Sequence, residues 1–206
     1  MLVARAANRS TLESGPDPRC ISGRPTSVSV AADALSVVRL CAAAALPGAL
    51  VRAVELPRGR WVPLALFVVA AASDVIDGAV ARRAGGASRH GAVLDNGADL
   101  AFVLAGTGTG AALGLLSWVV PSAIVLAFGA YVVASAGRRA AEGGWRRARS
   151  TAGHAAGVLN YGLTGLLTLA VASPGRIWPP VLRLASIMVV AANLAALLER
   201  LVPRRA

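Results

Sequence analysis

Four aspartates lie close together in a chain that is otherwise poor in acidic residues. Of the ten acidic residues among 206, four fall between positions 74 and 99, namely Asp74, Asp77, Asp95 and Asp99. The first two end an apolar run that begins at Trp61, and the last two open the next apolar run. Burying a carboxylate at membrane depth costs several kcal/mol, so such residues usually have a partner and a function.

The spacing within each pair places two carboxylates on one face of a helix. Asp74 and Asp77 are three residues apart, and Asp95 and Asp99 are four apart, which is the spacing of neighbours on a helix surface. Two adjacent antiparallel helices would bring all four together. Clustered carboxylates need cations to remain ionised, and oxygen ligands of this kind favour Mg²⁺, Mn²⁺ or Ca²⁺ over zinc. We therefore expect a site that could hold two divalent ions, as in phosphoryl displacement.

Small residues and an arginine accompany the carboxylates. Gly78 and Ala81 lie four and seven residues after Asp74, which leaves room on that face for a large anionic ligand to approach the backbone. Arg82 follows, and its guanidinium could bind a phosphate through two parallel hydrogen bonds. Gly91 precedes the second pair. These residues suit an anionic substrate beside the metal site.

Other roles for the aspartates are open at this point. They could neutralise Arg82, Arg83 and Arg89 at a membrane boundary, although Asp95 and Asp99 lie far enough into an apolar run to make that costly. A cation- or proton-coupled transporter also uses intramembrane aspartates, but it would scatter them near the midplane and often show paired halves. A non-catalytic membrane scaffold is the third alternative, and the intact set of four aspartates argues against it.

The stretch from 74 to 99 reads D-V-I-D-G-A-V-A-R, eight residues, then G-A-V-L-D-N-G-A-D. It resembles the signature of the CDP-alcohol phosphatidyltransferase family, D-x2-D-G-x2-A-R-x8-G-x3-D-x3-D, at all eight fixed positions and every spacing. Upstream, D-A-L-S-V-V-R at 33–39 is similar to the N-x-L-T-x-x-R pattern of the family's first helix. There Asp33 stands where Asn is commoner, and Ser36 where Thr is commoner. The likeness covers roughly residues 28–202.

The resemblance implies an enzyme of phospholipid biosynthesis. Such an enzyme transfers a substituted phosphate, such as a phosphatidyl group, from a CDP-alcohol such as CDP-diacylglycerol to a hydroxyl acceptor, with release of CMP. It is a homodimer that uses Mg²⁺ or Mn²⁺, as two ions. The metal ligands that the resemblance implies are Asp74, Asp77, Asp95 and Asp99, with Asp99 also the general base. The residues that it implies for the CDP moiety are Gly78, Ala81, Arg82, Gly91, Ser36 and Arg39.

Two residues before the signature have alternative interpretations. Arg39 could be an arginine at the membrane boundary whose side chain extends to water. Asp33 could pair with Arg39 instead of contributing to the site.

The acceptor is left open by the sequence. Family members use glycerol 3-phosphate, inositol phosphate, serine, phosphatidylglycerol or amino-alcohols. Leu100 follows Asp99 directly, where several glycerol- and inositol-phosphate enzymes have Lys or Arg, and this disfavours those acceptors. His154, Asn160 and Tyr161 could contact an acceptor, or they could be ordinary polar residues of a membrane helix.

The elements that must position these residues are long apolar segments. Hydrophobic residues make up 56% of the chain and charged residues only 15%, whereas a soluble domain has about a quarter charged residues. Apolar runs of about 20 residues match a bilayer-crossing helix, and we predict an all-α membrane protein with six transmembrane helices in one bundle. The six segments are 28–50, 61–81, 94–118, 119–136, 152–173 and 177–198. We expect one domain over residues 27–206 after a disordered tail, 1–26.

Details within the segments predict their ends and their packing. Pro121 and the pair Pro179–Pro180 suit first-turn positions of the fourth and sixth helices. The stretch 106–114 is rich in small residues, which predicts that the third helix packs inside the bundle.

The charge pattern indicates the orientation. The net charge is +11 and all 21 basic residues are arginine, but no aromatic-interleaved basic module is present, so we expect no nucleic-acid partner. The arginine-rich segments 82–89, 138–149 and 200–205 fall on the side of the N-terminal tail. This bias predicts a multi-pass protein of the cell membrane whose active site lies at the cytoplasmic side.

Overall fold

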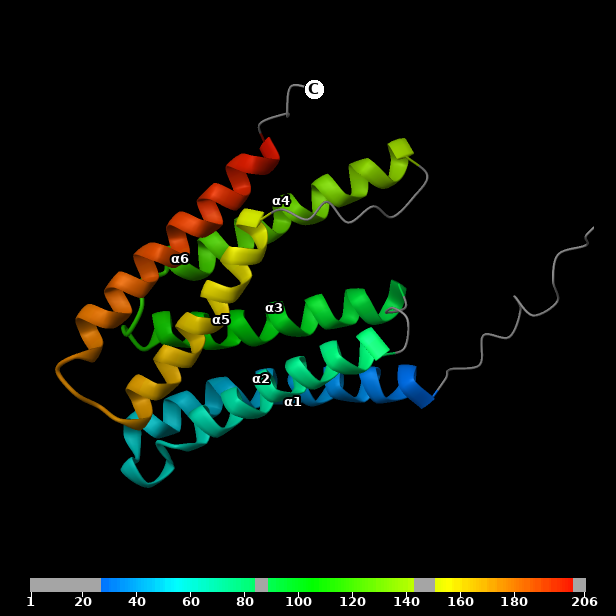
Figure 1. Ribbon diagram of the computed structural model, residues 1–206. Coiled ribbons are helices and arrows are strands. Elements are labelled where there is room, and N and C mark those ends of the chain that lie inside the picture. Colours follow the sequence, from blue (N-terminus) through cyan, green and yellow to red (C-terminus); the bar gives the residue numbers. More distant parts are fainter. Residues whose placement is uncertain (1–26, 84–88, 143–150, 202–206) are drawn as a thin grey trace, which may run out of the picture.

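A computed structural model describes the backbone of residues 27–83, 89–142 and 151–201, and the side chains of 34–76 apart from 57, of 96–134 and of 152–201. Within these ranges the chain forms α-helices, one short 3-10 turn and no strands (Figure 1). The helices are α1 (Ser27–Glu55), α2 (Val62–Arg83), α3 (Arg89–Ala112), α4 (Val119–Glu142), α5 (Thr151–Ala172) and α6 (Trp178–Leu201), with the turn η2 (Pro57–Gly59) after α1. The prediction of an all-α chain is confirmed for this part of the protein, which forms six α-helices.

The helices differ in how well they suit a bilayer. By length and composition, three stretches are long and apolar enough to cross a membrane: Ala34–Glu55, Ala152–Ala172 and Trp178–Leu201. The apolar stretches of α2 and α4 are shorter, Val62–Ile76 and Val119–Ala134. The described residues thus support a membrane protein, with three helices that meet the criterion for a span.

The third helix ends earlier than its apolar run. The sequence predicts a segment to position 118, but α3 ends at Ala112, so that prediction is wrong. Gly114 has a φ of 71°, a left-handed conformation that glycine adopts without steric cost. Its N–H donates to Ala111 O at 3.1 Å, and Leu115 N–H donates to Gly110 O at 2.9 Å. These are the two bonds of a Schellman motif, which terminates a helix whatever the hydropathy beyond it.

The proline predictions are confirmed. Pro121 lies in the first turn of α4, and Pro179 and Pro180 lie in the first turn of α6. The first turn of a helix tolerates proline because its N–H groups have no partner within the helix.

The helices pack around α1 and α5. α1 contacts both α2 and α3, while α5 contacts α2 and α3 on one side and α6 on the other (Figure 1). α4 lies mainly against α6. The core consists of buried apolar side chains from all six helices. Its largest fully buried members are Leu46, Leu50, Phe102, Ile124, Leu163, Leu167, Val120 and Val189.

Glycines let α3 and α5 approach closely. A Cβ atom built on Gly106 would lie 2.7 Å from Cγ2 of Thr164, and one on Gly110 would lie 2.7 Å from Cδ2 of Leu167. No real side chain could occupy those positions without displacing its neighbour. Both glycines are buried, so this face of α3 lies inside the bundle, as predicted.

Polar contacts join α6 to its two neighbours. Asn193 Nδ2 donates to Asn160 Oδ1 of α5 at 2.7 Å, and both residues are buried. Arg200 Nη1 donates to Ala127 O of α4 at 2.7 Å, and its guanidinium lies 5.1 Å from the ring centre of Tyr131. Such contacts favour helix association where lipid offers no hydrophobic driving force. The pairing of Asn160 with a neighbouring helix agrees with its interpretation as a packing residue.

Candidate active site

A buried arginine of α1 joins the first and the last aspartate of the cluster. Arg39 is 0% exposed, and its Nη1 lies 2.7 Å from Oδ1 of Asp99 on α3. Its Nη2 lies 3.4 Å from Oδ1 of Asp74 on α2. One guanidinium therefore gathers two carboxylates that come from different helices and are 25 positions apart in the chain (99 − 74).

This placement decides between the interpretations of Arg39. An arginine that extends to water would be exposed at its guanidinium, but this one is enclosed and ion-paired, so the boundary interpretation is wrong. A buried charge is stable only with compensating partners, and Asp99 and Asp74 supply them. The Asp33 side chain lies outside the described residues, and its pairing with Arg39 stays a prediction.

The two carboxylates are more accessible than the arginine behind them. The side chain of Asp74 is 50% exposed and that of Asp99 is 32% exposed, whereas that of Arg39 is 0% exposed. The cluster thus has a closed side at α1 and an open side at the carboxylates. A ligand can reach the acidic oxygens without displacing the helices.

A tyrosine of α5 approaches the same aspartate. The hydroxyl of Tyr161 lies 3.4 Å from Oδ1 of Asp99. Its ring stacks on Phe102 at 5.7 Å between centroids and 22° between planes, and it lies 6.0 Å from Phe67. Aromatic rings from α2, α3 and α5 therefore form an apolar cluster beside the charged groups.

The four contacting residues share one depth in the bundle. Arg39, Asp99 and Tyr161 lie 12, 10 and 10 residues after the starts of α1, α3 and α5, and Asp74 lies 9 residues before the end of α2, which is roughly 15 Å along each helix axis. Antiparallel packing brings such positions together, because the chain runs in opposite directions along consecutive helices. This shared depth is the sequence signal that places Tyr161 near the aspartates, whereas the spacing within each aspartate pair contains no information about α5.

The other signature residues are placed only by their backbone. Asp77, Gly78, Ala81 and Arg82 belong to α2, and Gly91 and Asp95 belong to α3. Both aspartate pairs therefore lie on helices, as predicted, but the side chains of these six residues lie outside the described ones. Ser36 is buried one turn before Arg39, and His154 is exposed near the start of α5.

The carboxylates of Asp74 and Asp99 can be compared with the ligands that divalent cations prefer. Among the side chains that the structure describes, no three His, Cys, Asp or Glu residues gather around one point. Asp77 and Asp95 are not among those side chains. Asp74 and Asp99 contribute carboxylate oxygens from different helices at one guanidinium, and such oxygens are the ligands that Mg²⁺ and Mn²⁺ prefer. The described half of the set therefore fits a hard divalent cation.

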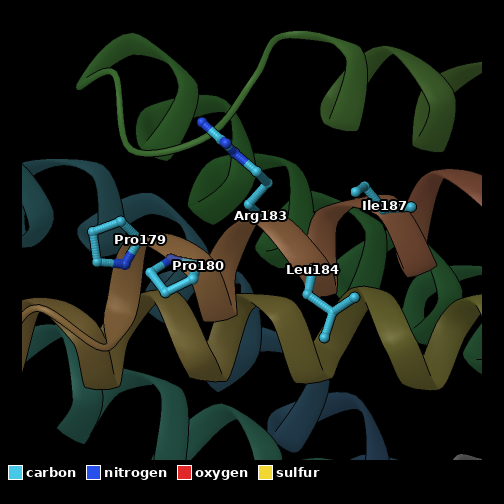
Figure 2. Close-up of a pocket in the computed structure, with 5 residues that line it drawn as sticks. All are labelled: Pro179, Pro180, Arg183, Leu184 and Ile187. Carbon is cyan, nitrogen blue, oxygen red and sulfur yellow. The ribbon is translucent and has the colours of Figure 1, made fainter.

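A surface hollow lies elsewhere. Its volume is about 420 Å³, and residues of the first half of α6 line it (Figure 2): Pro179, Pro180, Arg183, Leu184 and Ile187. The start of α6 lies at the opposite end of the bundle from the α2–α3 connection (Figure 1). The hollow is therefore separate from the carboxylate cluster.

Comparison with known proteins found a family whose model matches most of the chain. The family model described as CDP-alcohol phosphatidyltransferase matches residues 29–196. That range runs from the first turn of α1 into α6 and includes both aspartate pairs, Arg39 and Tyr161. A comparison with curated proteins found no match.

Proposed function

Because the chain belongs to the CDP-alcohol phosphatidyltransferase family, we propose that it transfers a phosphatidyl group from CDP-diacylglycerol or a related CDP-alcohol to a hydroxyl acceptor. The family uses CDP-alcohol donors and alcohol acceptors in phospholipid biosynthesis, and it is generally dependent on divalent metal. The observation that carries the proposal is the convergence of Asp74 and Asp99 on Arg39, at 3.4 and 2.7 Å. It supports a shared acidic site where the family signature requires one.

We assign the metal to the four signature aspartates, Asp74, Asp77, Asp95 and Asp99. The partly exposed carboxylates of Asp74 and Asp99 support this assignment. Two bound Mg²⁺ or Mn²⁺ ions would neutralise charge on the transferring phosphoryl group. The buried guanidinium of Arg39 holds two of the aspartates in place from the closed side.

We assign the proton transfer to Asp99. The acceptor oxygen forms a bond to the phosphorus nearest the lipid, and the bond from that phosphorus to the bridging oxygen of CMP breaks. The bridging oxygen keeps the electron pair, so CMP leaves as an anion. The acceptor proton must pass to a base within about 3 Å. Asp99 is suited to this role because its carboxylate is partly exposed yet fixed at one oxygen by Arg39.

We assign binding of the CDP moiety to small residues and an arginine that follow the first carboxylate pair, and to the glycine that precedes the second pair. Gly78, Ala81 and Gly91 would allow close approach of the nucleotide to α2 and α3, and Arg82 would bind a phosphate. Ser36 would contribute from α1, where it is buried one turn before Arg39. The family resemblance also implies a homodimer, which stays a prediction.

Tryptophans at one end of the bundle support a position of that end at a membrane–water interface. Trp61, Trp118 and Trp178 stand at or just before the starts of α2, α4 and α6, at the end of the bundle opposite the α2–α3 connection (Figure 1). Trp61 and Trp118 are 60% and 61% exposed. Tryptophan is enriched where membrane meets water, so this end suits one interface. The arginine-rich end with the carboxylates would then face the cytoplasm.

The test is a direct assay of CMP release. Purified protein in lipid nanodiscs is incubated with radiolabelled CDP-diacylglycerol and Mg²⁺, and each candidate alcohol is added in turn. We expect CMP only with the correct acceptor, together with a labelled lipid product. Thorough chelation with EDTA should abolish release, and Mg²⁺ or Mn²⁺ should restore it.

Two results would contradict the proposal. Full activity after chelation would exclude the metal role of the aspartates. Equal CMP release with and without every acceptor, with phosphatidic acid as the product, would indicate a hydrolase. The matched control is Asp99→Asn, which keeps the shape of the side chain and removes the basic oxygen.

A further inference from the structure

Two donors from different helices approach the same oxygen of Asp99. Nη1 of Arg39 lies 2.7 Å from Oδ1, and the hydroxyl of Tyr161 lies 3.4 Å from it. We propose that Tyr161 is a positioning residue, which together with Arg39 holds the Asp99 carboxylate in the orientation that accepts the proton of the acceptor hydroxyl. This inference rests on the proposed function, because it takes Asp99 as the base.

The geometry explains why two donors are needed. A single contact on Oδ1 leaves the carboxylate free to rotate about its Cβ–Cγ bond, a torsion with broad preferences. Donors that approach Oδ1 from α1 and from α5 restrict that rotation. Because the carboxylate is planar, fixing Oδ1 also fixes Oδ2. A base held in this way has its reactive oxygen positioned before the acceptor arrives.

The Tyr161 hydroxyl is itself held by packing. Its ring stacks on Phe102, which is 0% exposed and lies one turn after Asp99 on α3. Phe67 of α2 lies 6.0 Å from the tyrosine ring and 6.3 Å from that of Phe102. These two contacts restrict rotation of the Tyr161 side chain and so keep its hydroxyl directed towards Asp99. The contact of 3.4 Å is long for O–H···O, and catalytic hydrogen bonds of this kind tighten in the substrate complex.

The backbone of α5 is anchored on both sides of Tyr161. Asn160 is hydrogen-bonded to Asn193 of α6 at 2.7 Å. One turn further, a Cβ atom on Gly165 would lie 2.6 Å from Cζ of Phe67, so only glycine lets the two helices approach this closely. These contacts set the rotation and the height of α5. The position of the phenol follows from the packing of α5 against α2 and α6.

The experiment compares two tyrosine-to-phenylalanine variants. Tyr161→Phe removes the hydroxyl and keeps the ring on Phe102 and Phe67. Tyr131→Phe is the matched control, because it makes the same change on α4, away from the aspartates. The kcat and the KM for donor and acceptor are measured by CMP release, and thermal unfolding is measured in the same nanodiscs.

We expect Tyr161→Phe to lower kcat by about 3- to 10-fold, as for loss of one hydrogen bond. Both KM values should stay within about twofold, and the melting temperature should fall only slightly, because the ring remains and a single hydrogen bond is lost. Tyr131→Phe should keep the wild-type kcat. An unchanged kcat in Tyr161→Phe would overturn the positioning role. A change confined to the acceptor KM would also overturn it, since the phenol would then bind the acceptor directly.

A second measurement does not depend on turnover. Thermal unfolding of Tyr161→Phe, Asp99→Asn and the double variant forms a double-mutant cycle, and we expect non-additive shifts because the two groups are in contact. Additive shifts would contradict the contact itself. An inactive wild type with every acceptor would overturn the proposed function and the catalytic role together. An active wild type with an unaffected Tyr161→Phe would overturn the positioning role alone.

Discussion

The guanidinium of Arg39 lies 2.7 Å from the carboxylate of Asp99, across 60 residues of sequence. The arginine is fully enclosed, and the aspartate is partly open. The same arginine reaches Asp74 at 3.4 Å. α1 is therefore the element that fixes the spacing between the two motif helices, and a change at position 39 should affect both aspartates at once.

Arg39→Lys tests this link. Lysine keeps the positive charge, but a single ammonium cannot present two nitrogens in a planar fork to two carboxylates. We expect CMP release to fall by about tenfold or more, because the relative position of Asp74 and Asp99 is lost. The amount of protein in the membrane fraction should stay near that of the wild type. The control is Arg183→Lys, an exposed position on α6, and wild-type turnover in Arg39→Lys would contradict the link.

Two glycines of α3 provide a matched test of the contact with α5. Alanine at Gly106 would place its Cβ 2.7 Å from Cγ2 of Thr164, which is buried and whose hydroxyl donates to Asn160 O at 3.0 Å. A β-branched side chain held in this way cannot rotate aside at low cost. We expect Gly106→Ala to destabilise the protein by about 1–3 kcal/mol, seen as a lower melting temperature in nanodiscs.

Gly108→Ala is the control on the same helix. Its Cβ would have no atom within 4 Å, and alanine favours a helix over glycine by about 1 kcal/mol. This variant should melt at or above the wild-type temperature. If Gly106→Ala were as stable as Gly108→Ala, the close approach of α3 and α5 would be wrong.

The helices themselves were largely predictable, because apolar runs bounded by charge or proline mark them directly. All six predicted segments overlap their helices, and the largest shifts, of six residues, are at the ends of α3 and α4. The end of α3 has an identifiable cause. Hydropathy continues past Ala112, but Gly114 closes the helix through local hydrogen bonds. A stop signal was present in the glycine, and the apolar composition around it concealed the signal.

The site was predictable in its residue types and less so in its connections. The spacing of Asp74 and Asp99 placed them on helices that could meet, since helix periodicity is local. The link through Arg39 and the approach of Tyr161 depend on which helices become neighbours. That is decided by long-range packing, such as Gly165 against Phe67, and local periodicity contains no information about it.

Membrane topology gives a separate prediction. Reporter fusions placed after Arg89 and after Arg147 should both report the cytoplasm, because positively charged segments are retained on that side. Residue 147 lies outside the described ranges, so the fusion also tests the connection between α4 and α5. A fusion after Gly59, in the turn between α1 and α2, should report the opposite side. An external signal at either of the first two points would contradict the proposed orientation.

The last prediction separates a base from a metal ligand at Asp99. Asp99→Asn keeps the length and shape of the side chain but removes the basic oxygen, and it also weakens the charge pairing with Arg39 at 2.7 Å. If Asp99 accepts the acceptor proton, the variant should still bind CDP-alcohol and metal, yet lose about 10²-fold or more in kcat.

Asp74→Asn is the comparison, because Asp74 contacts the same arginine at 3.4 Å and is assigned only to the metal. Its activity should recover in part at high Mg²⁺, since mass action can offset a weakened ligand set. Turnover at increasing Mg²⁺ concentration distinguishes the two variants. Recovery of Asp99→Asn along the same curve as Asp74→Asn would show that Asp99 serves mainly as a ligand and that another group takes the proton.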